Sequence, residues 1–375
     1  MIRLGLSIAA LLLGLLSIFP APTYHTWLLA VMVTEFPLIF MAVAFVLILM
    51  ASITEKFKTA GTVIAVVTLI LFSTPVARAF LIGDNLKIEL HQAFKGSEAS
   101  IPEERPFSFW KLAMRGDTDA AYKRLKYSAY PGAASTLDFY EADSLGLRPC
   151  IIVVHGGSWS SGDSRQLPEL NTYLVQQGYH VASVNYHKSP QCRSPQPLED
   201  VSAAISYLRG RAAELRIDTS NVVILGRSAG AQIALMAAYK RVSPGIRGVI
   251  SFYGPADMVW GYSAPASKWV MDSKRVMENY LGGTYSEVPE KYRSASPIEH
   301  VSADSPPTLI IHGKNDVLVA YEHSLRLGTK LEQHGVPHFL LKLPWATHGF
   351  DYTLNGPGGQ LSTFAVNMFL RKIIR

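Results

Sequence analysis

The stretch NVVILGRSAGAQIALMAAY, residues 221–239, changes from a buried strand to an alanine-rich helix at Gly226-Arg227-Ser228-Ala229-Gly230. A serine between a strand and a helix, with a glycine two residues away on each side, predicts a nucleophile elbow. The serine at such a turn has a strained backbone, and larger side chains at the glycine positions would clash. The turn would lift the Ser228 hydroxyl above the carboxyl edge of a parallel sheet, where open α/β sheets bind ligands.

The rest of the C-terminal two thirds repeats the alternation of strand and helix. Two segments, LKYSAY (125–130) and STLDFYEA (135–142), have the period-two pattern of strands. Continuous apolar runs are typical of strands buried on both faces; these are PCIIVVHGG, HVASVNY, NVVILG, GVISFYG, PTLIIHG and HFLLKLP. Helical stretches such as LEDVSAAISYLRGRAAEL lie between them. The pattern predicts an α/β domain over residues 121–375, with a mostly parallel sheet flanked by helices.

A serine nucleophile needs a base, and the base needs an orienting acid. After an elbow of this type the acid comes first in the chain and the histidine second. We predict His348 as the base, because it lies in the loop after the strand HFLLKLP. Asp316, three residues after the strand PTLIIHG, is the predicted acid, and Asp351 is its only rival. His312 ends a buried strand and is predicted to be a core residue.

The segment HGGSW supplies backbone donors for an oxyanion. Gly156 and Gly157 have no side chain to block their N–H groups, and Ala229 adds an N–H at the start of a helix. Residues 257–285 are too long for a simple connection between strands, so a small cap is predicted at about residues 257–295. Its aromatic residues would line the substrate pocket or only pack the cap onto the sheet. The predicted pocket residues are Trp159, Tyr253 and Trp260.

The N-terminal region differs in composition. Hydrophobic residues make up 49% of the chain and charged residues 17%, which indicates a membrane portion. Residues 1–82 are predicted to form a membrane region with about three transmembrane helices, at about residues 4–19, 27–51 and 60–77. The first run is also compatible with a signal peptide, although Pro20-Ala21-Pro22 does not resemble a cleavage site.

The second apolar run contains Glu35, two residues before Pro37. A carboxyl group inside a membrane is a functional candidate. Its simpler interpretation is a protonated side chain that faces a neighbouring helix beside a proline kink. No second ionisable residue lies in the other runs, which favours this simpler interpretation.

Positive charges predict the orientation of this region. Arg3, Lys56 and Lys58 would lie on the cytoplasmic side, which leaves everything after residue 82 outside the cytoplasm. The expected location is therefore a multi-pass membrane protein with an extracytoplasmic catalytic domain. Residues 83–120 are predicted to be a membrane-proximal linker. Within it, PEERPFSFWKLAMRG (102–116) would lie at the membrane interface or pack as a helix on the catalytic domain.

Charge and cysteine content exclude several classes of protein. The net charge of +6 is not gathered into a basic tract, which argues against a nucleic-acid partner. Cys150 and Cys192 have neither CxxC spacing nor a nearby histidine cluster, so no metal site and no cofactor is expected. The two cysteines would lie at opposite edges of the sheet, too far apart for a disulfide. The expected partners are a small acyl ester or lipid-like substrate and the membrane.

From about Leu125 to its end, the chain resembles α/β-hydrolases of the esterase/lipase type, near the hormone-sensitive-lipase and feruloyl-esterase-like groups. The resemblance is carried in order by VVHGGSW, GRSAG, SPIEHVSADSPPTLIIHGKNDVLV and HGFDYTLNGPGGQ. It implies a carboxylic ester hydrolase with a Ser–Asp–His triad and no cofactor. Two departures leave the substrate open: Ser158 stands where many lipases have a third glycine, and Arg227 where many relatives have an acidic residue.

The triad alone does not fix the reaction. The same three residue types serve acyltransferases and peptidases, so these remain alternatives to an esterase. A non-catalytic binding module is a third class. It is disfavoured because such proteins usually lose the nucleophile or the histidine, whereas this chain has both Ser228 and His348.

Overall fold

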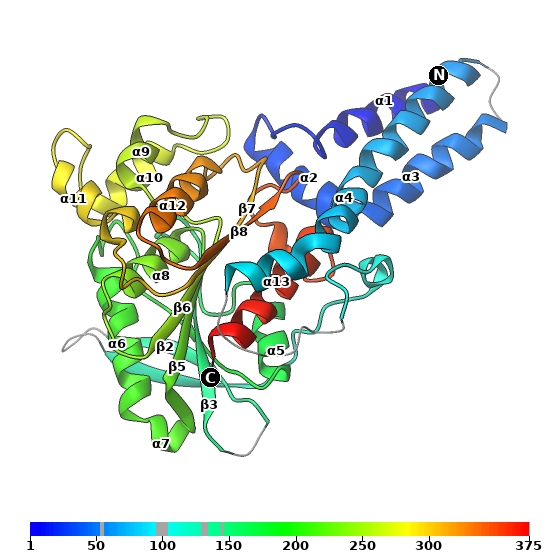
Figure 1. The fold of residues 1–375 in the computed structure, drawn as a ribbon. Helices are drawn as coiled ribbons and strands as arrows, with labels where there is room; N and C mark the ends of the chain where they lie inside the picture. Colours follow the sequence, from blue (N-terminus) through cyan, green and yellow to red (C-terminus); the bar gives the residue numbers. More distant parts are fainter. Residues whose placement is uncertain (53–55, 95–103, 129–133, 144–145, 375) are drawn as a thin grey trace.

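The structure is a computed structural model that describes residues 1–52, 56–94, 104–128, 134–143 and 146–374 (Figure 1). At its centre is an eight-stranded sheet in the order β1-β2-β4-β3-β5-β6-β7-β8. β1, β2 and β4 pair antiparallel, and all other neighbours pair parallel. Each segment predicted as a strand overlaps one of these strands, and residues 129–130 of the first predicted segment lie outside the described residues. The strands are β1 (Tyr122–Ser128), β2 (Ala134–Tyr140), β3 (Arg148–Val154), β4 (His180–Val184), β5 (Ile217–Arg227), β6 (Ile246–Phe252), β7 (Thr308–Gly313) and β8 (His338–Leu343).

Helices cover both faces of the sheet (Figure 1). β3 shows why its sequence is apolar throughout: Cys150 and Ile152 pack into the core on one face, and Ile151 and Val153 into the core on the other. The first face is covered by α6 (Gln196–Gly210), α8 (Ala229–Tyr239) and α12 (Glu322–Gln333), with the short α7 (Ala212–Leu215) after α6. The second face is covered by α5 (Glu169–Gln176), α13 (Pro357–Ile373) and the end of α4 (Lys58–Ala93).

The connection from β6 to β7 contains the predicted cap. It forms three short helices and one 3-10 turn, namely α9 (Met258–Ser263), α10 (Ser273–Leu281), α11 (Pro289–Ser294) and η3 (Pro297–His300). A second 3-10 turn, η4 (Phe350–Tyr352), follows β8. Tyr280 and Leu281 of α10 and Tyr292 of α11 are buried in the core that also contains α8. The cap is therefore fixed to the domain beside the start of α8.

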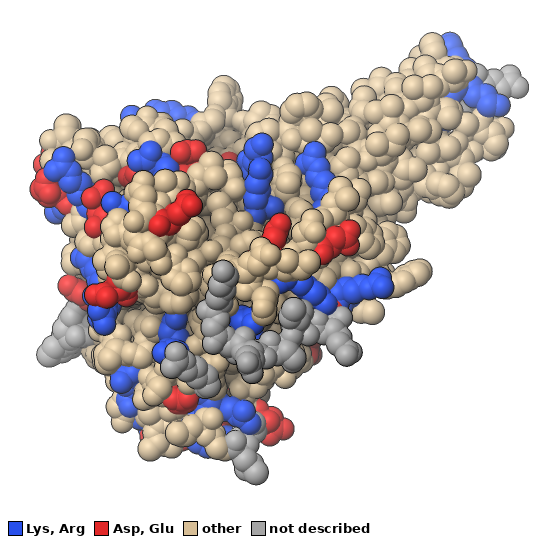
Figure 2. Space-filling view, in the orientation of Figure 1, with Lys and Arg blue, Asp and Glu red and all other residues tan. Residues whose placement is uncertain are grey.

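A helical arm projects from the α/β domain (Figure 1). The arm consists of α1 (Ile2–Leu15), α3 (Pro37–Leu49), η1 (Met50–Ser52) and residues 58–77 of α4. Figure 2 shows almost no charge along its visible length and basic side chains at its far end. Arg3 Nη1 donates to Lys58 O at 3.2 Å, so α1 and α4 both begin at this end.

Length and composition support fewer membrane crossings than the three predicted. Within the described ranges, only α4 is long and apolar enough to cross a membrane as one helix. α1 has 14 residues and falls short of that length. α2 (Tyr24–Glu35) and α3 meet the criteria only as a pair, and an 87° bend separates them. The predicted spans at residues 4–19 and 27–51 are thus not continuous membrane-length helices.

The break at Phe36 has a local cause. Pro37 has no N–H to donate, and its ring disfavours the helical conformation at the residue before it. Phe36 accordingly has φ −120° and ψ 49°, outside the helical region. α2 then lies against the catalytic domain, where the N–H of Tyr24 donates to the carbonyl of Trp269 in the cap at 3.0 Å.

Glu35 ends α2 and is buried at this break. Its Oε2 accepts the N–H of Gly358 at 2.9 Å, in the first turn of α13. The simpler interpretation is a side chain that faces a neighbouring helix beside a proline kink, and the helix that Glu35 contacts is α13 of the α/β domain. A carboxyl group at this position offsets the unpaired N–H groups that every helix has at its first turn.

The predicted domain boundary at residue 82 falls inside α4, which continues to Ala93. Leu86 and Leu90 of this extension are buried against the core that contains α13. The described part of the segment 102–116 starts at residue 104 and is bound to the domain through Phe107, which packs edge-on against Phe80 at 4.7 Å. The short turn η2 (Phe109–Ala113) follows, and Trp110 within it is 76% exposed.

Candidate active site

Ser228 stands between β5 and α8 at the carboxyl edge of the sheet. Its φ of 53° and ψ of −123° are unusual for a residue with a side chain. The flanking glycines are needed because the backbone approaches closely on both sides. A Cβ at Gly226 would lie 2.3 Å from the carbonyl oxygen of Gly230, and a Cβ at Gly230 would lie 2.3 Å from that of Val154. The local geometry is the elbow that the sequence predicts.

Asp316 and His348 come together at the same edge. Asp316 follows β7 and His348 follows β8, and the distance from Asp316 Oδ2 to His348 Nδ1 is 2.7 Å. The other carboxylate oxygen, Oδ1, accepts the N–H groups of Leu318 and Val319, each at 2.9 Å. His348 and Ser228 line one groove. The contact with Asp316 can orient the imidazole of His348 in the groove that Ser228 also lines.

His312 supports the same carboxylate. It is fully buried, as expected for a core residue, and its Nε2 lies 3.1 Å from Asp316 Oδ2. Its Nδ1 lies 2.6 Å from the hydroxyl of Ser324. Burial by itself raises the pKa of Asp316, but His348 and His312 outweigh burial and hold that pKa below its ordinary value. Asp316 is therefore ionised where it contacts His348.

Asp351, the rival acid, has different partners. It is buried and accepts the Nε–H of Arg227 and the hydroxyl of Tyr253, each at 2.5 Å. This ion pair explains why a basic residue stands beside Ser228 in the elbow. The ring of Tyr253 lies 4.2 Å from the ring of His348, so Tyr253 links the ion pair to the histidine by packing.

The predicted oxyanion donors divide into two groups. The N–H of Gly156 donates to Gln166 Oε1 at 2.7 Å and so has an acceptor already, contrary to its predicted role. The N–H groups of Gly157, Ser158 and Ala229 have no acceptor among the described residues. The sequence reasoning missed Ser158 as a donor, although its position directly after the two glycines is a signal for one.

Two cavities meet at Ser228. We call the first the cap cavity; it has a volume of about 110 Å³ and is lined by Ser228, Trp159, Val276, Met277, Leu318 and Val319, among others. We call the second the α2 groove; it has a volume of about 730 Å³ and is lined by Ser228, His348, Tyr253 and, from α2, Tyr24, Trp27, Leu28, Val31 and Met32, among others.

The predicted pocket residues have different positions. Trp159 lines the cap cavity, where its ring stacks on Tyr280 at 4.3 Å, and Tyr253 lines the α2 groove. Trp260 lines neither, which corrects the prediction. Its ring packs edge-on against His323 at 4.9 Å, and Arg326 lies over it at 5.7 Å, so Trp260 holds α9 against α12.

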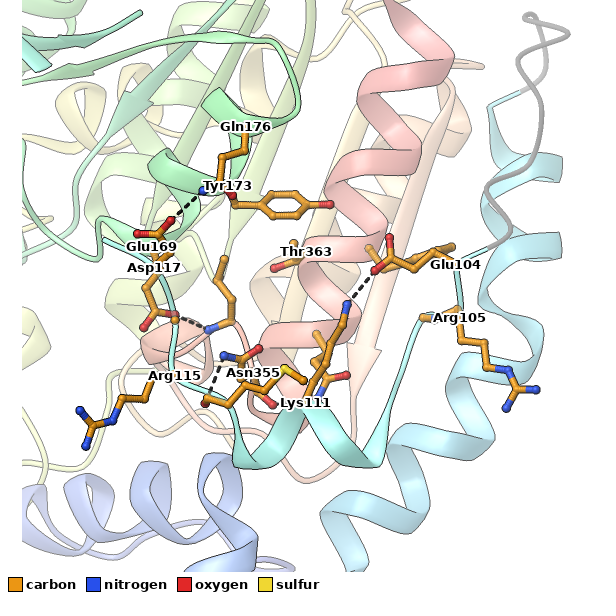
Figure 3. A pocket seen from close by; sticks show the side chains of 16 residues that line it. Glu104, Arg105, Lys111, Arg115, Asp117, Glu169, Tyr173, Gln176, Asn355 and Thr363 are labelled. Atoms are coloured by element: carbon orange, nitrogen blue, oxygen red, sulfur yellow. Dashed lines mark hydrogen bonds and ion pairs between the residues drawn. The ribbon is translucent and has the colours of Figure 1, made fainter. Parts of the chain in front are cut away.

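A third pocket lies between the segment that follows residue 103, α5 and α13 (Figure 3). Its charged groups already have partners: Lys111 pairs with Glu104 at 2.7 Å, and Asp117 accepts from Gln176 at 2.7 Å. Figure 3 shows Arg105 and Arg115 pointing away from it. The described residues that line it include no serine, cysteine or histidine, so it holds no Ser–His or Cys–His pair.

The described ranges contain no group of three His, Cys, Asp or Glu side chains that could hold a metal ion. Cys150 is buried and Cys192 partly exposed, and both are free thiols, as predicted from their positions at opposite edges of the sheet.

The sequence of this chain is similar to those of known esterases. The BD-FAE family model matches residues 137–331, which is more than half of the chain. The matched range includes Ser228 and Asp316 and ends before His348. The chain is 28% identical to the probable carboxylic ester hydrolase LipM of Mycobacterium tuberculosis, over 66% of this chain and 60% of LipM. It is 29% identical to the esterase LipQ of the same organism, over 59% of this chain and 55% of LipQ. The chain thus spans little more than half of the length of these relatives.

Among solved structures, a bacterial heroin esterase has a TM-score of 0.60 and 21% sequence identity, with 69% of this chain and 86% of that one covered. At this identity the similarity concerns the fold alone. The fold is that of the esterase α/β-hydrolases.

Proposed function

The chain belongs to the BD-FAE family, and from this premise we propose that it is a serine hydrolase that cleaves carboxylic esters, with Ser228, His348 and Asp316 as its triad. The proposed catalytic domain covers residues 121–375, with the cap at 257–295. The observation that carries the proposal is the 2.7 Å contact between Asp316 and His348 at the sheet edge where the elbow presents Ser228.

The proposed reaction has two halves. His348 takes the proton of the Ser228 hydroxyl while its oxygen attacks the carbonyl carbon of the ester. The negative charge on the carbonyl oxygen is met by the N–H groups of Gly157, Ser158 and Ala229, and one such donor is typically worth ~2.7–4 kcal/mol of barrier. The bond to the alcohol oxygen then breaks, and His348 gives its proton to that oxygen. Water attacks the acyl-enzyme by the same route, which releases the acid and restores Ser228.

The purified full chain in detergent should release p-nitrophenol from p-nitrophenyl esters, measured from acetate to hexadecanoate. An acceptor alcohol added to the same assay distinguishes the alternative, acyl transfer, because transfer would yield a new ester in place of the free acid. A folded protein that releases no p-nitrophenol at any chain length would contradict the proposed esterase activity.

We infer further that the helical arm inserts into a membrane with its far end toward the cytoplasm. Residues 58–77 of α4 are 20 in number and would extend ~30 Å at 1.5 Å per residue, the thickness of the hydrocarbon core. Arg3, Lys56 and Lys58 belong to the far end, and positive charge favours the cytoplasmic side. The catalytic domain would then lie outside the cytoplasm.

Protease added to right-side-out vesicles is expected to digest the catalytic domain, whereas inverted vesicles should protect it. A cytoplasmic marker protein controls for incomplete sealing of the vesicles. It must stay intact when protease is added to the right-side-out vesicles. Digestion only in inverted vesicles would reverse the orientation, and recovery of the chain in the soluble fraction would contradict insertion.

A further inference from the structure

We propose that the substrate is a short-chain acyl ester of a long, membrane-resident alcohol. The acyl group would occupy the cap cavity, and the chain of the alcohol would lie in the α2 groove. This inference rests on the ester hydrolysis proposed above and names the class of substrate for the same site.

The position of His348 decides which cavity takes the alcohol. His348 must give its proton to the leaving alcohol oxygen, so that oxygen has to lie beside the imidazole. His348 lines the α2 groove and is not among the residues that line the cap cavity. The cap cavity shares Ser158, Ser228, Met271 and Leu318 with the groove, but its lining also includes Ala229 and Trp159, which do not line the groove. The leaving alcohol therefore belongs in the α2 groove, and the acyl group in the cap cavity.

The sizes of the two cavities set the lengths of the two groups. The cap cavity, about 110 Å³, is much smaller than the α2 groove, about 730 Å³. Most residues that line it are apolar. Trp159 in its wall is fixed, because its ring stacks on Tyr280 and both side chains hydrogen-bond to Gln232, at 3.1 and 3.2 Å. A short acyl group fits there, whereas a long chain fits only in the groove.

The wall of the groove is apolar and is attached to the site. Leu28, Val31 and Met32 of α2 face the groove. Trp27 Nε1 donates to the carbonyl of His348 at 2.9 Å, which fixes α2 to the loop of the histidine. Asn315, next to Asp316, donates to the carbonyl of Ile18 after α1 at 3.0 Å. Both loops that carry the proposed base and acid thus contact the segment between α1 and α3.

This segment joins two helices of the arm and lies where the arm meets the α/β domain (Figure 1). Its helix α2 contributes Trp27, Leu28 and Met32, among others, to the lining of the groove. Exposed apolar side chains are present on both sides of the 87° bend between α2 and α3. Leu28 is 43% and Met32 40% exposed on α2, and Ile39 is 59% and Val43 47% exposed on α3. A chain in the groove can therefore extend along α3 into the apolar layer that surrounds the arm. This arrangement identifies the occupant as the chain of a membrane alcohol.

Two isomeric esters test the inference directly. Hexadecyl acetate and ethyl hexadecanoate have the same composition, with the long chain on the alcohol in one and on the acyl group in the other. The full chain is reconstituted in phosphatidylcholine vesicles that contain one isomer, and acid release is followed by titration. Hexadecyl acetate is expected to have the higher kcat/KM by at least about tenfold, the discrimination that one well-packed methylene provides.

Leu28→Asp and Leu29→Asp are a matched pair of variants. The two leucines are neighbours on α2 with the same 43% exposure, but only Leu28 lines the groove. Leu28→Asp is expected to lower the ratio of kcat/KM for hexadecyl acetate to kcat/KM for ethyl hexadecanoate by about tenfold or more. Leu29→Asp should leave this ratio unchanged. The ratio does not depend on the fraction of folded protein.

The outcomes separate this inference from the proposed function. Equal rates on the two isomers, or a preference for ethyl hexadecanoate, would overturn the assignment of the cavities while ester hydrolysis stands. An equal fall of the ratio in both leucine variants would overturn the role of the α2 groove. Absence of p-nitrophenyl acetate hydrolysis would overturn the proposed function and this inference with it.

Discussion

Ser228→Ala is expected to lower kcat for ester hydrolysis on the order of 10⁶-fold, because the oxyanion donors and the binding groove alone cannot form an acyl-enzyme. Folding should be nearly unchanged. Alanine has a Cβ like serine, so it tolerates the φ of 53° at the elbow no better and no worse. The measurements are initial rates on p-nitrophenyl acetate and the temperature of unfolding.

A fluorophosphonate probe gives an independent readout, since it labels an activated serine covalently. The wild-type chain should be labelled at Ser228 and the alanine variant should not. Ser160→Ala is a suitable control, because Ser160 is an exposed serine in the loop after the HGG segment and should not affect labelling. Equal labelling of the Ser228→Ala variant would place the nucleophile elsewhere.

Asp316→Asn is expected to lower kcat on the order of 10⁴-fold, the typical loss when the acid of a triad is replaced by its amide. The carboxylate accepts a hydrogen bond at His348 Nδ1, which leaves Nε2 free to take the proton of Ser228. An amide at this position can donate to Nδ1 and stabilise the wrong tautomer. It also cannot balance the positive charge that forms on the imidazole. Rates on p-nitrophenyl acetate across pH check this loss.

Asp351→Asn is the matched control, because it replaces the rival acid. Removal of one partner from a buried ion pair typically costs ~3–5 kcal/mol of folding free energy, here by leaving Arg227 unpaired. We expect a lower unfolding temperature and a kcat far above that of Asp316→Asn, measured below the unfolding transition. A larger loss of kcat in Asp351→Asn than in Asp316→Asn would exchange the two roles.

The sheet and the positions of Asp316 and His348 could be predicted because their signals are local. Strands buried on both faces are continuous apolar runs, and each of the two residues follows such a run within a few positions. The elbow has a local sequence pattern, although only Gly226 is required by the turn itself, whereas Gly230 is required by the carbonyl of Val154 at the end of β3. Parallel strands bring their carboxyl ends to one edge, so sequence order was sufficient to bring these residues together.

The N-terminal region could not be predicted in the same way, because its structure depends on contacts distant in sequence. Hydropathy treats residues 27–51 as one apolar run, yet Pro37 breaks it and Glu35 pairs with Gly358, 323 residues later. A contact over a shorter sequence distance changes the role of Gly156, because its N–H donates to the side chain of Gln166. Trp260 has a large aromatic side chain of the kind that lines substrate pockets. Its position, however, is determined by contacts with His323 and Arg326, which are distant in sequence.

The bond from Trp27 to the carbonyl of His348 joins residues 321 positions apart, and this separation has a consequence for biosynthesis. At ~5–20 residues per second, a ribosome needs tens of seconds after it has made α2 to deliver the loop that α2 binds. During that interval the Nε1–H of Trp27 lacks this acceptor, because the His348 loop has not yet been made. The contact between α2 and the His348 loop, and with it this side of the α2 groove, can therefore form only after nearly the whole chain has been made.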